Sequence, residues 1–249
     1  MPPIVLTFAA SDPTGGAGLQ ADLLTLAALG CHPLSVLTGL TVQDTSGVEY
    51  LEAIAADLVV RQARSLLAET RVAAFKAGVL ASADNVRAVA AIAEAHAEVP
   101  LVVDPVLASG RGDPLARDAV HSALLEALVP RTTVLTPNSV EAERLGGAQR
   151  LLDLGARYVL VTGTHDDTPE VINRLYDAGG LVREDRWQRL PGSYHGSGCT
   201  LASALAAALA NGRGVPEAVR EAQAYTWQAL AAGFRTGAGQ LLPNRFYRR

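Results

Sequence analysis

The chain has 249 residues, of which 49% are hydrophobic and 18% are charged, and its formal net charge at pH 7 is −4. This composition excludes a disordered chain and provides a sizeable buried core, which predicts one domain over residues 1–249. The acidic balance disfavours a nucleic-acid or anionic-membrane surface, so we expect neither kind of partner.

Short β-rich runs alternate with longer helical patterns along most of the chain. The predicted strands are 4–9, 35–42, 49–54, 73–76, 101–103, 133–135 and 158–161. The predicted helices between them are 17–29, 58–67, 85–96, 116–128 and 148–154. Strands that alternate with helices indicate βαβ units. We therefore expect an α/β fold with a mostly parallel sheet that is covered on both faces.

The order of the elements changes after Gly163. Residues 171–176 and 181–187 flank a glycine-rich turn, which predicts an antiparallel hairpin. Two long helices follow, at about 199–210 and 216–232. We expect the hairpin to act as a lid or to pack against a second subunit, and we expect a homodimer.

Polar residues and glycines follow the predicted parallel strands. They are Ser11, Asp12, Gln43, Asp44, Gly78, Asp104, Asn138, Glu141, Thr162 and Gly163. Ligands of open α/β sheets bind outside the carboxyl ends of the strands. This convergence predicts one binding site at that edge of the sheet.

The strongest single motif is Gly196-Ser197-Gly198, which opens an Ala/Leu-rich helix. Glycines let several N–H groups point at one place, and the helix N-terminus adds positive potential, so this segment suits an anion such as a transferring phosphoryl group. Cys199 lies in the first helical turn, where a thiolate is stabilised. It is expected to be a general base or a neighbour of the substrate hydroxyl. The alternative is a small buried hydrophobic residue.

A second glycine-rich segment, residues 11–22, follows the first strand. It is not a P-loop, because no GK[ST] closes it. A flexible loop with a carboxylate at each end suits a neutral polar heterocycle. The alternative is a simple strand-to-helix turn with Asp22 on a solvated face.

A third motif, Asn138 with Glu141, places an amide and a carboxylate on one side of a helix start. Such oxygens position Mg²⁺ through waters, and Asp104 offers a further carboxylate. The alternative is an N-cap and its capping-box partner.

In combination, these motifs resemble the hydroxymethylpyrimidine kinase and hydroxymethylpyrimidine phosphate kinase family of thiamine biosynthesis. This family is a branch of the ribokinase-like superfamily, which also contains pyridoxal kinases. The resemblance runs from about residue 4 to 227. The segments that carry it are Ala10–Asp22, Val42–Gln43, Lys76–Ser82, Val103–Val106, Thr136–Glu143 and His195–Thr200.

The resemblance implies a ribokinase-like three-layer αβα sandwich with a small β hairpin or lid. It also implies an ATP-dependent, Mg²⁺-dependent kinase. The implied substrates are 4-amino-5-hydroxymethyl-2-methylpyrimidine and then its monophosphate.

The resemblance also implies a role for each matching residue. The anion hole and catalytic group would be Gly196, Ser197, Gly198 and Cys199. The pyrimidine would contact Ala10, Asp22, Val42, Gln43 and Val106. ATP and Mg²⁺ would be organised by Asp104, Asn138, Glu141 and Thr162, with Asp104 and Glu141 nearest the metal. Lys76 would either balance charge in the site or form a structural salt bridge.

Three positions depart from the family pattern. The family usually has Gly at Ala10, Met at Val79 and Lys at Thr162. Ala10 implies a slightly tighter pocket beside the pyrimidine, Val79 bears on which substrate or phosphorylation step is preferred, and Thr162 removes a charge near the ATP phosphates. Three alternatives stay open: a pyridoxal kinase, a non-catalytic pyrimidine sensor, and a cysteine hydrolase that uses His195 and Cys199.

The remaining features bear on location. Two cysteines, Cys31 and Cys199, are too few for a disulfide framework, and the N-terminus does not match a secretory signal peptide. No apolar run is long enough to span a bilayer. We therefore expect a cytoplasmic protein. The basic end, residues 245–249, is interpreted as a solvated tail.

Overall fold

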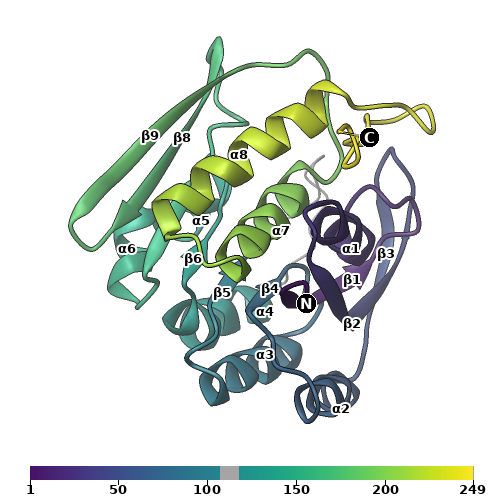
Figure 1. Ribbon diagram of the computed structural model, residues 1–249, viewed down its shortest axis with the longest axis vertical. Coiled ribbons are helices and arrows are strands. Elements are labelled where there is room, and N and C mark those ends of the chain that lie inside the picture. Colours follow the sequence, from purple (N-terminus) through teal and green to yellow (C-terminus); the bar gives the residue numbers. More distant parts are fainter. Residues whose placement is uncertain (107–117, 249) are drawn as a thin grey trace.

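A computed structural model describes residues 1–106 and 118–248 (Figure 1). Its centre is a nine-stranded sheet in the order β3-β2-β1-β4-β5-β6-β7-β8-β9. The strands are β1 (Ile4–Ser11), β2 (His32–Gln43), β3 (Val48–Ala53), β4 (Ala74–Ala77), β5 (Leu101–Val103), β6 (Val134–Leu135), β7 (Tyr158–Val161), β8 (Glu170–Asp177) and β9 (Gly180–Gln188). The six neighbouring strands β2, β1, β4, β5, β6 and β7 pair in parallel. Strand β3 pairs antiparallel at one edge, and β8 and β9 pair antiparallel at the other. The mostly parallel sheet is confirmed.

Helices cover both faces of this sheet, as Figure 1 shows. They are α1 (Gly18–Ala28), α2 (Ala56–Leu67), α3 (Ala83–Ala95), α4 (Asp118–Ala123), α5 (Ser139–Arg144), α6 (Ala148–Asp153), α7 (Ser197–Ala210) and α8 (Val215–Ala231). A π-helical turn η1 (Leu124–Leu128) and a 3-10 turn η2 (Val129–Arg131) continue α4. The predicted helix 116–128 is therefore helical from residue 118 to 128, with a π-helical last part, and its residues 116 and 117 lie outside the described part. Helices α1, α7 and α8 lie on one face of the sheet, and α2, α3 and α4 lie on the other.

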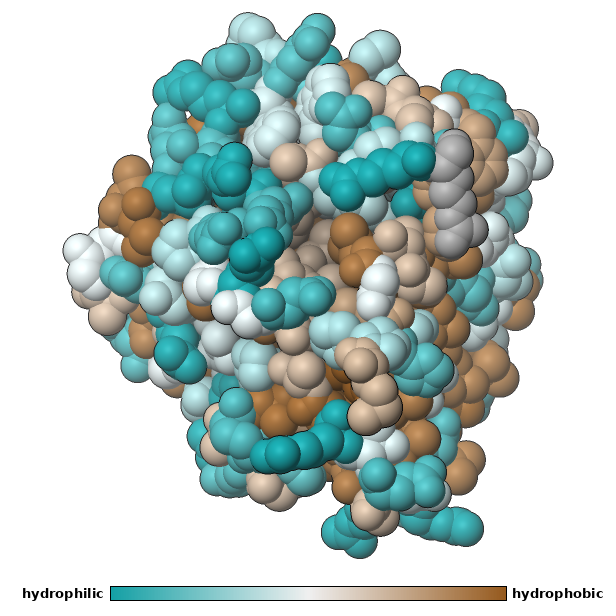
Figure 2. Space-filling model, viewed as in Figure 1, coloured by the Kyte–Doolittle hydropathy of each residue, from teal (hydrophilic) through white to brown (hydrophobic). Residues whose placement is uncertain are grey.

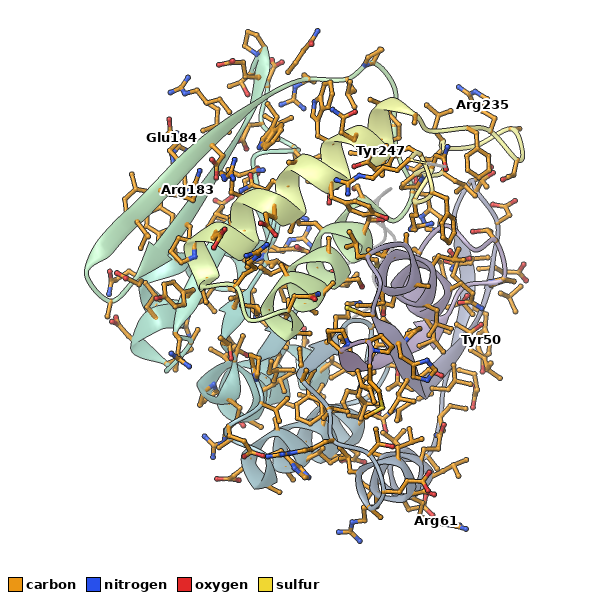
Figure 3. All side chains as sticks on the ribbon, in the orientation of Figure 1. Tyr50, Arg61, Arg183, Glu184, Arg235 and Tyr247 are labelled. Atoms are coloured by element: carbon orange, nitrogen blue, oxygen red, sulfur yellow. The ribbon has the colours of Figure 1, made fainter. Side chains whose placement is uncertain are left out.

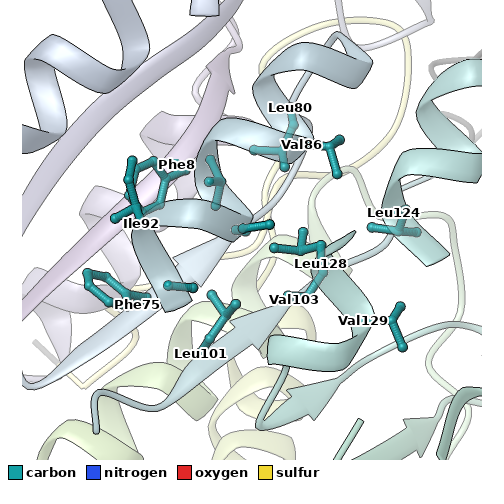
Figure 4. Packing of buried hydrophobic residues seen from close by; sticks show 14 of the residues in the cluster. Phe8, Phe75, Leu80, Val86, Ile92, Leu101, Val103, Leu124, Leu128 and Val129 are labelled. Carbon is teal, nitrogen blue, oxygen red and sulfur yellow. The ribbon is translucent and has the colours of Figure 1, made fainter. Parts of the chain in front are cut away.

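Alternation along the strands divides the core into two layers. Because successive side chains of a strand point to opposite faces, Leu6 and Phe8 of β1 pack toward α3, whereas Val5 packs toward α7. Figure 4 shows part of the first layer, a buried cluster to which Phe8, Phe75, Leu101 and Leu128 belong. The same alternation turns Thr7 and Lys76, which are register partners on β1 and β4, toward α1 and α7. Two polar side chains thus enter the second layer.

The predicted hairpin is confirmed as β8 and β9, and it continues the central sheet, because β8 pairs with β7. Ion pairs lie on both faces of the hairpin. Arg174 bonds Glu184 at 2.9 Å, and Arg183 bonds Asp185 at 2.6 Å on the face toward α8, where Asp185 also accepts a hydrogen bond from Gln223; Figure 3 labels Arg183 and Glu184. Figure 2 shows a face on which hydrophilic residues gather mainly at the upper left and apolar residues lie among polar ones through the centre and along the right side. Among the described helices, none is long and apolar enough to cross a membrane.

The chain beyond α8 returns across the carboxyl ends of the strands. Leu241 forms a bridge with Tyr194, and Leu242 forms one with Phe234. The Gln240 amide donates to the Thr45 carbonyl at 2.9 Å, next to the turn between β2 and β3. This C-terminal segment therefore lies beside the loops that follow β1 and β2.

Candidate active site

A cavity of about 450 Å³ opens at the carboxyl ends of the parallel strands. Most residues expected in the site line this cavity. They are Ala10, Gln43, Asp104, Val106, Asn138, Glu141, Thr162, Gly196, Ser197, Gly198 and Cys199. The structure therefore brings together motifs that are separated by up to 189 residues in sequence, from Ala10 to Cys199.

The loop between β1 and α1 is held by the carboxylate of Asp12. This carboxylate accepts hydrogen bonds from the Thr14 amide at 2.8 Å, the Thr14 hydroxyl at 2.9 Å and the Ala17 amide at 2.7 Å. It also lies 2.8 Å from His195 Nε2, which joins the loop to the segment before α7. Burial acts to raise the pKa of Asp12, but the bonds from His195 and Thr14 outweigh it and lower the pKa to about 2.

The two glycine-rich segments touch at Gly196. This residue has a φ of +81°, and a Cβ at this position would lie 1.8 Å from the carbonyl oxygen of Gly16. Only glycine fits such a conformation and contact. Helix α7 begins at the next residue, so its free N–H groups face the cavity at the junction of both segments.

Cys199 is buried in the first turn of α7. Burial raises the pKa of its thiol to about 12, and this effect outweighs the favourable charge of Lys76. The expectation of a stabilised thiolate is therefore wrong, because burial removes the hydration that a thiolate would need. The sulfur accepts a hydrogen bond from the Gly18 amide, and the thiol bonds the carboxylate of Asp104.

Asp104 is the carboxyl group nearest to Cys199 among those that line the cavity. It follows β5 and is 6% exposed. Burial raises its pKa to about 6, although the charge of Lys76 and the bond from Cys199 act in the opposite direction. Asp104 is therefore a group that can accept a proton near neutral pH.

Asp22 lies beneath the cavity and does not line it. It is fully buried, and its oxygens bond Thr7 Oγ1 at 2.6 Å, Lys76 Nζ at 2.9 Å and Ser203 Oγ at 2.7 Å. The solvated alternative for Asp22 is wrong, because the residue is fully buried, and its predicted contact with the pyrimidine stays a prediction. Of the two roles considered for Lys76, the structure shows a salt bridge, with both partners at 0% exposure.

Val42 also lies away from the cavity wall. It is 52% exposed on β2, where the strand pairs with β3 near the edge of the sheet. Its neighbour Gln43 does line the cavity, because alternate residues of a strand face opposite sides.

Asn138 and Glu141 form the capping box that was considered as an alternative. The backbone N–H of Asn138 donates to Glu141 Oε2 at 3.0 Å, and the backbone N–H of Glu141 donates to Asn138 Oδ1 at 2.9 Å. Both side chains also line the cavity, as does Asp104. These oxygens fit Mg²⁺ that keeps most of its waters, whereas no cluster of three or more His, Cys, Asp or Glu side chains occurs in the described part.

Sequence patterns missed several residues of the cavity wall. Arg189, just after β9, donates to the carbonyls of Thr164 at 2.8 Å, Asp166 at 2.8 Å and Thr168 at 2.7 Å, and so orders the loop after Thr162. Trp187 and Trp227 stack with ring centroids 6.5 Å apart and an angle of 30° between the rings, and both line the cavity. No periodicity or motif marks these positions.

The Asp12 contacts predict how stability depends on acidity. An ordinary Asp has a pKa of about 3.9 in an unfolded chain, so the lower folded-state value stabilises the protein above about pH 4. This contribution disappears as the pH falls through about 2. We expect the free energy of unfolding to fall less steeply between pH 4 and pH 2 in Asp12→Asn than in the parent, measured by urea unfolding. The exposed Asp84→Asn is the control, and equal slopes in all three proteins would contradict the assignment.

Comparison with known proteins identifies the family. The sequence model of the phosphomethylpyrimidine kinase family matches residues 12–244. The hydroxymethylpyrimidine/phosphomethylpyrimidine kinase of Streptomyces coelicolor is 41% identical, over 96% of this chain and 92% of its own.

Two solved structures share the fold, which confirms the three-layer ribokinase-like architecture. The pyridoxal kinase of Staphylococcus aureus, in complex with AMP-PCP and pyridoxal, has a TM-score of 0.89 and 28% identity over 99% of this chain and 95% of its own. The phosphomethylpyrimidine kinase of Clostridium difficile has a TM-score of 0.79 and 30% identity over 91% of this chain and 99% of its own. The chain belongs to the phosphomethylpyrimidine kinase family.

Proposed function

We propose that this protein transfers the γ-phosphoryl group of ATP to 4-amino-5-hydroxymethyl-2-methylpyrimidine and then to its monophosphate. The observation that carries the proposal is the meeting of the α7 N-terminus, Asp104 and Cys199 at one wall of the cavity. A helix N-terminus stabilises the charge of a transferring phosphoryl group, and the adjacent carboxyl accepts the hydroxyl proton. The names and similarity of the relatives support the same reaction.

The cavity offers different chemistry at its two ends. Ala10, Gln43, Val79 and Val106 give a small, mostly apolar surface with one amide, which suits the aminopyrimidine. Asn138, Glu141 and Thr162 belong to the segments after β6 and β7, and we assign them to the ATP phosphates and Mg²⁺. When bound, Mg²⁺ would neutralise phosphate charge, with Glu141 as the nearest carboxylate, which leaves Asp104 to bond Cys199.

The high pKa of Cys199 changes how the hydroxyl proton leaves. As the substrate oxygen bonds the γ-phosphorus, the bond from that phosphorus to the ADP oxygen breaks. The Cys199 thiol already bonds Asp104, so it passes its proton to that carboxylate while it receives the hydroxyl proton. Asp104 is then the base and Cys199 the relay.

Asp22 supports this site from below. It fixes Lys76, whose charge limits the rise that burial causes in the pKa of both Asp104 and Cys199. We therefore assign recognition of the ring to Gln43 and to backbone groups of the 12–18 loop, and assign Asp22 an indirect role.

One alternative has specific support. Pyridoxal bears a hydroxymethyl group, and pyridoxal kinases are among the structural neighbours at 28% identity. The hydrolase alternative lacks its key contact, because His195 bonds Asp12 and Cys199 bonds Asp104. A single domain, a homodimer and a cytoplasmic location stay predictions.

Turnover with defined substrates tests the proposal. The purified protein is incubated with MgATP and either hydroxymethylpyrimidine, its monophosphate or pyridoxal, and ADP and phosphorylated products are followed. We expect ADP with both pyrimidines, because the cavity provides a hydroxyl site next to an anion hole. Turnover of pyridoxal alone would move the protein to the sister activity. Saturable pyrimidine binding without ADP formation would favour the sensor.

Replacement of Cys199 tests the relay. Cys199→Ala should lower kcat by about 10²-fold or more, since positioned proton transfer contributes on that scale. The KM for MgATP should change little, because Cys199 is assigned to the substrate hydroxyl and not to the ATP phosphates. The control is Cys31→Ala, which removes the other buried thiol far from the cavity wall. An unchanged kcat in Cys199→Ala would eliminate the role.

A further inference from the structure

The basic C-terminal end is not a solvated tail throughout. Arg245 is 5% exposed, whereas Arg248 is exposed and lies over the ring of Tyr247. The expectation of a solvated tail is therefore wrong at Arg245. A guanidinium that is taken out of water needs hydrogen-bond partners, and the structure shows which groups provide them.

Arg245 joins the two glycine-rich segments of the site. Its Nη2 donates to the Gly16 carbonyl at 2.5 Å, and its Nη1 donates to the Gly15 carbonyl at 3.2 Å. Its Nε lies 3.2 Å from the Thr200 hydroxyl, which itself donates to the Gly196 carbonyl at 2.8 Å. One side chain thus bonds the loop after β1 and the first turn of α7.

The carbonyl of Gly16 is held between two neighbours. On one side it lies so close to Gly196 that a Cβ there would be 1.8 Å away, and on the other side it accepts the bond from Arg245. The Asp12–His195 contact is a second link between the loop after β1 and the segment before α7. The distance between the 12–18 loop and the proposed anion hole at Gly196–Cys199 therefore depends on these contacts.

The main chain around Arg245 is itself anchored on α8. The Tyr225 hydroxyl donates to the Arg245 carbonyl at 2.7 Å, and the Asn244 amide donates to the Ala229 carbonyl at 2.9 Å. The rings of Tyr225 and Tyr247 lie 5.6 Å apart, and Figure 3 shows Tyr247 beside the end of the chain. A side chain fixed in this way can position its partners.

The charge of Arg245 also matters. Its described hydrogen-bond acceptors, two carbonyls and a hydroxyl, are all neutral. A buried cation bonded only to neutral groups adds positive potential to its surroundings, and here those surroundings are the N-terminus of α7.

We propose that Arg245 is a positioning residue for phosphoryl transfer, which sets the Gly15–Gly16 loop against the anion hole and adds positive potential to it. This inference rests on the proposed function. It extends the site to the C-terminal segment, more than 40 residues beyond Cys199 in sequence.

The first test compares kcat and KM in Arg245→Ala, Arg245→Lys and the exposed control Arg248→Met, each assayed well below its own melting temperature. Arg245→Ala should lower kcat per folded molecule by about 10²-fold, the cost of a misplaced reacting group, while the KM for MgATP changes much less. Arg245→Lys should lose less, because it keeps the charge without the planar fork. Added guanidinium ion should restore part of the activity of Arg245→Ala. A folded Arg245→Ala with the kcat of the parent would overturn the proposal.

The second test needs no turnover and so separates this proposal from the proposed function. In a Cys31→Ser background, a disulfide reagent reports only on Cys199, whose sulfur is covered by the Gly18 amide. If Arg245 fixes the loop, Arg245→Ala should raise the reaction rate of Cys199 by about tenfold, because the loop opens more often. Arg248→Met should not change this rate. Equal rates in the folded Arg245 and Arg248 variants would overturn the proposal even if the parent phosphorylates no tested substrate.

Discussion

The site is built on one buried ion pair, that of Lys76 with Asp22. Both side chains have 0% exposure, and the separation of nitrogen and oxygen is 2.9 Å. Burial acts against the charge of Lys76, but Asp22 and other nearby acidic groups outweigh it and raise the pKa, so the ammonium stays charged. Space for it comes from Gly78, where a Cβ would lie 2.6 Å from Nζ. A fixed positive charge therefore lies under the reacting end of the cavity.

This charge links the chemistry of the wall to the packing of the core. It acts to lower the pKa of Asp104 and of Cys199, while burial raises both. Asp104 therefore has a pKa of about 6 and Cys199 one of about 12, and on this basis we propose Asp104 as the base and Cys199 as the relay. In the proposed mechanism the α7 N-terminus holds the phosphoryl group above this ion pair, and Arg245 joins the same helix to the Gly15–Gly16 loop. Fixed positive groups thus lie behind the place where negative charge develops.

Much of the fold and the location of the site could be predicted from the sequence, because both depend on local patterns. The alternation of strands and helices predicted the parallel sheet, and the polar residues that follow the strands predicted much of the cavity wall. The direction of single side chains could not be predicted. Asp22 is buried because Thr7, Lys76 and Ser203 meet it, and Ser203 is 181 residues away in sequence. Arg189 and Arg245 bind backbone carbonyls, which carry no residue-specific signal.

The central claim, that the Lys76 charge is needed to bury Asp22, is tested most directly by a double-mutant cycle. Urea unfolding is measured for the parent, Lys76→Met, Asp22→Asn and the double variant. Lys76→Met should lose about 3–5 kcal/mol, because it leaves a buried carboxylate without its cation, and the double variant should recover much of that loss. If Lys76→Met unfolds like the parent, or if the two single losses simply add, the ion pair does not govern this site.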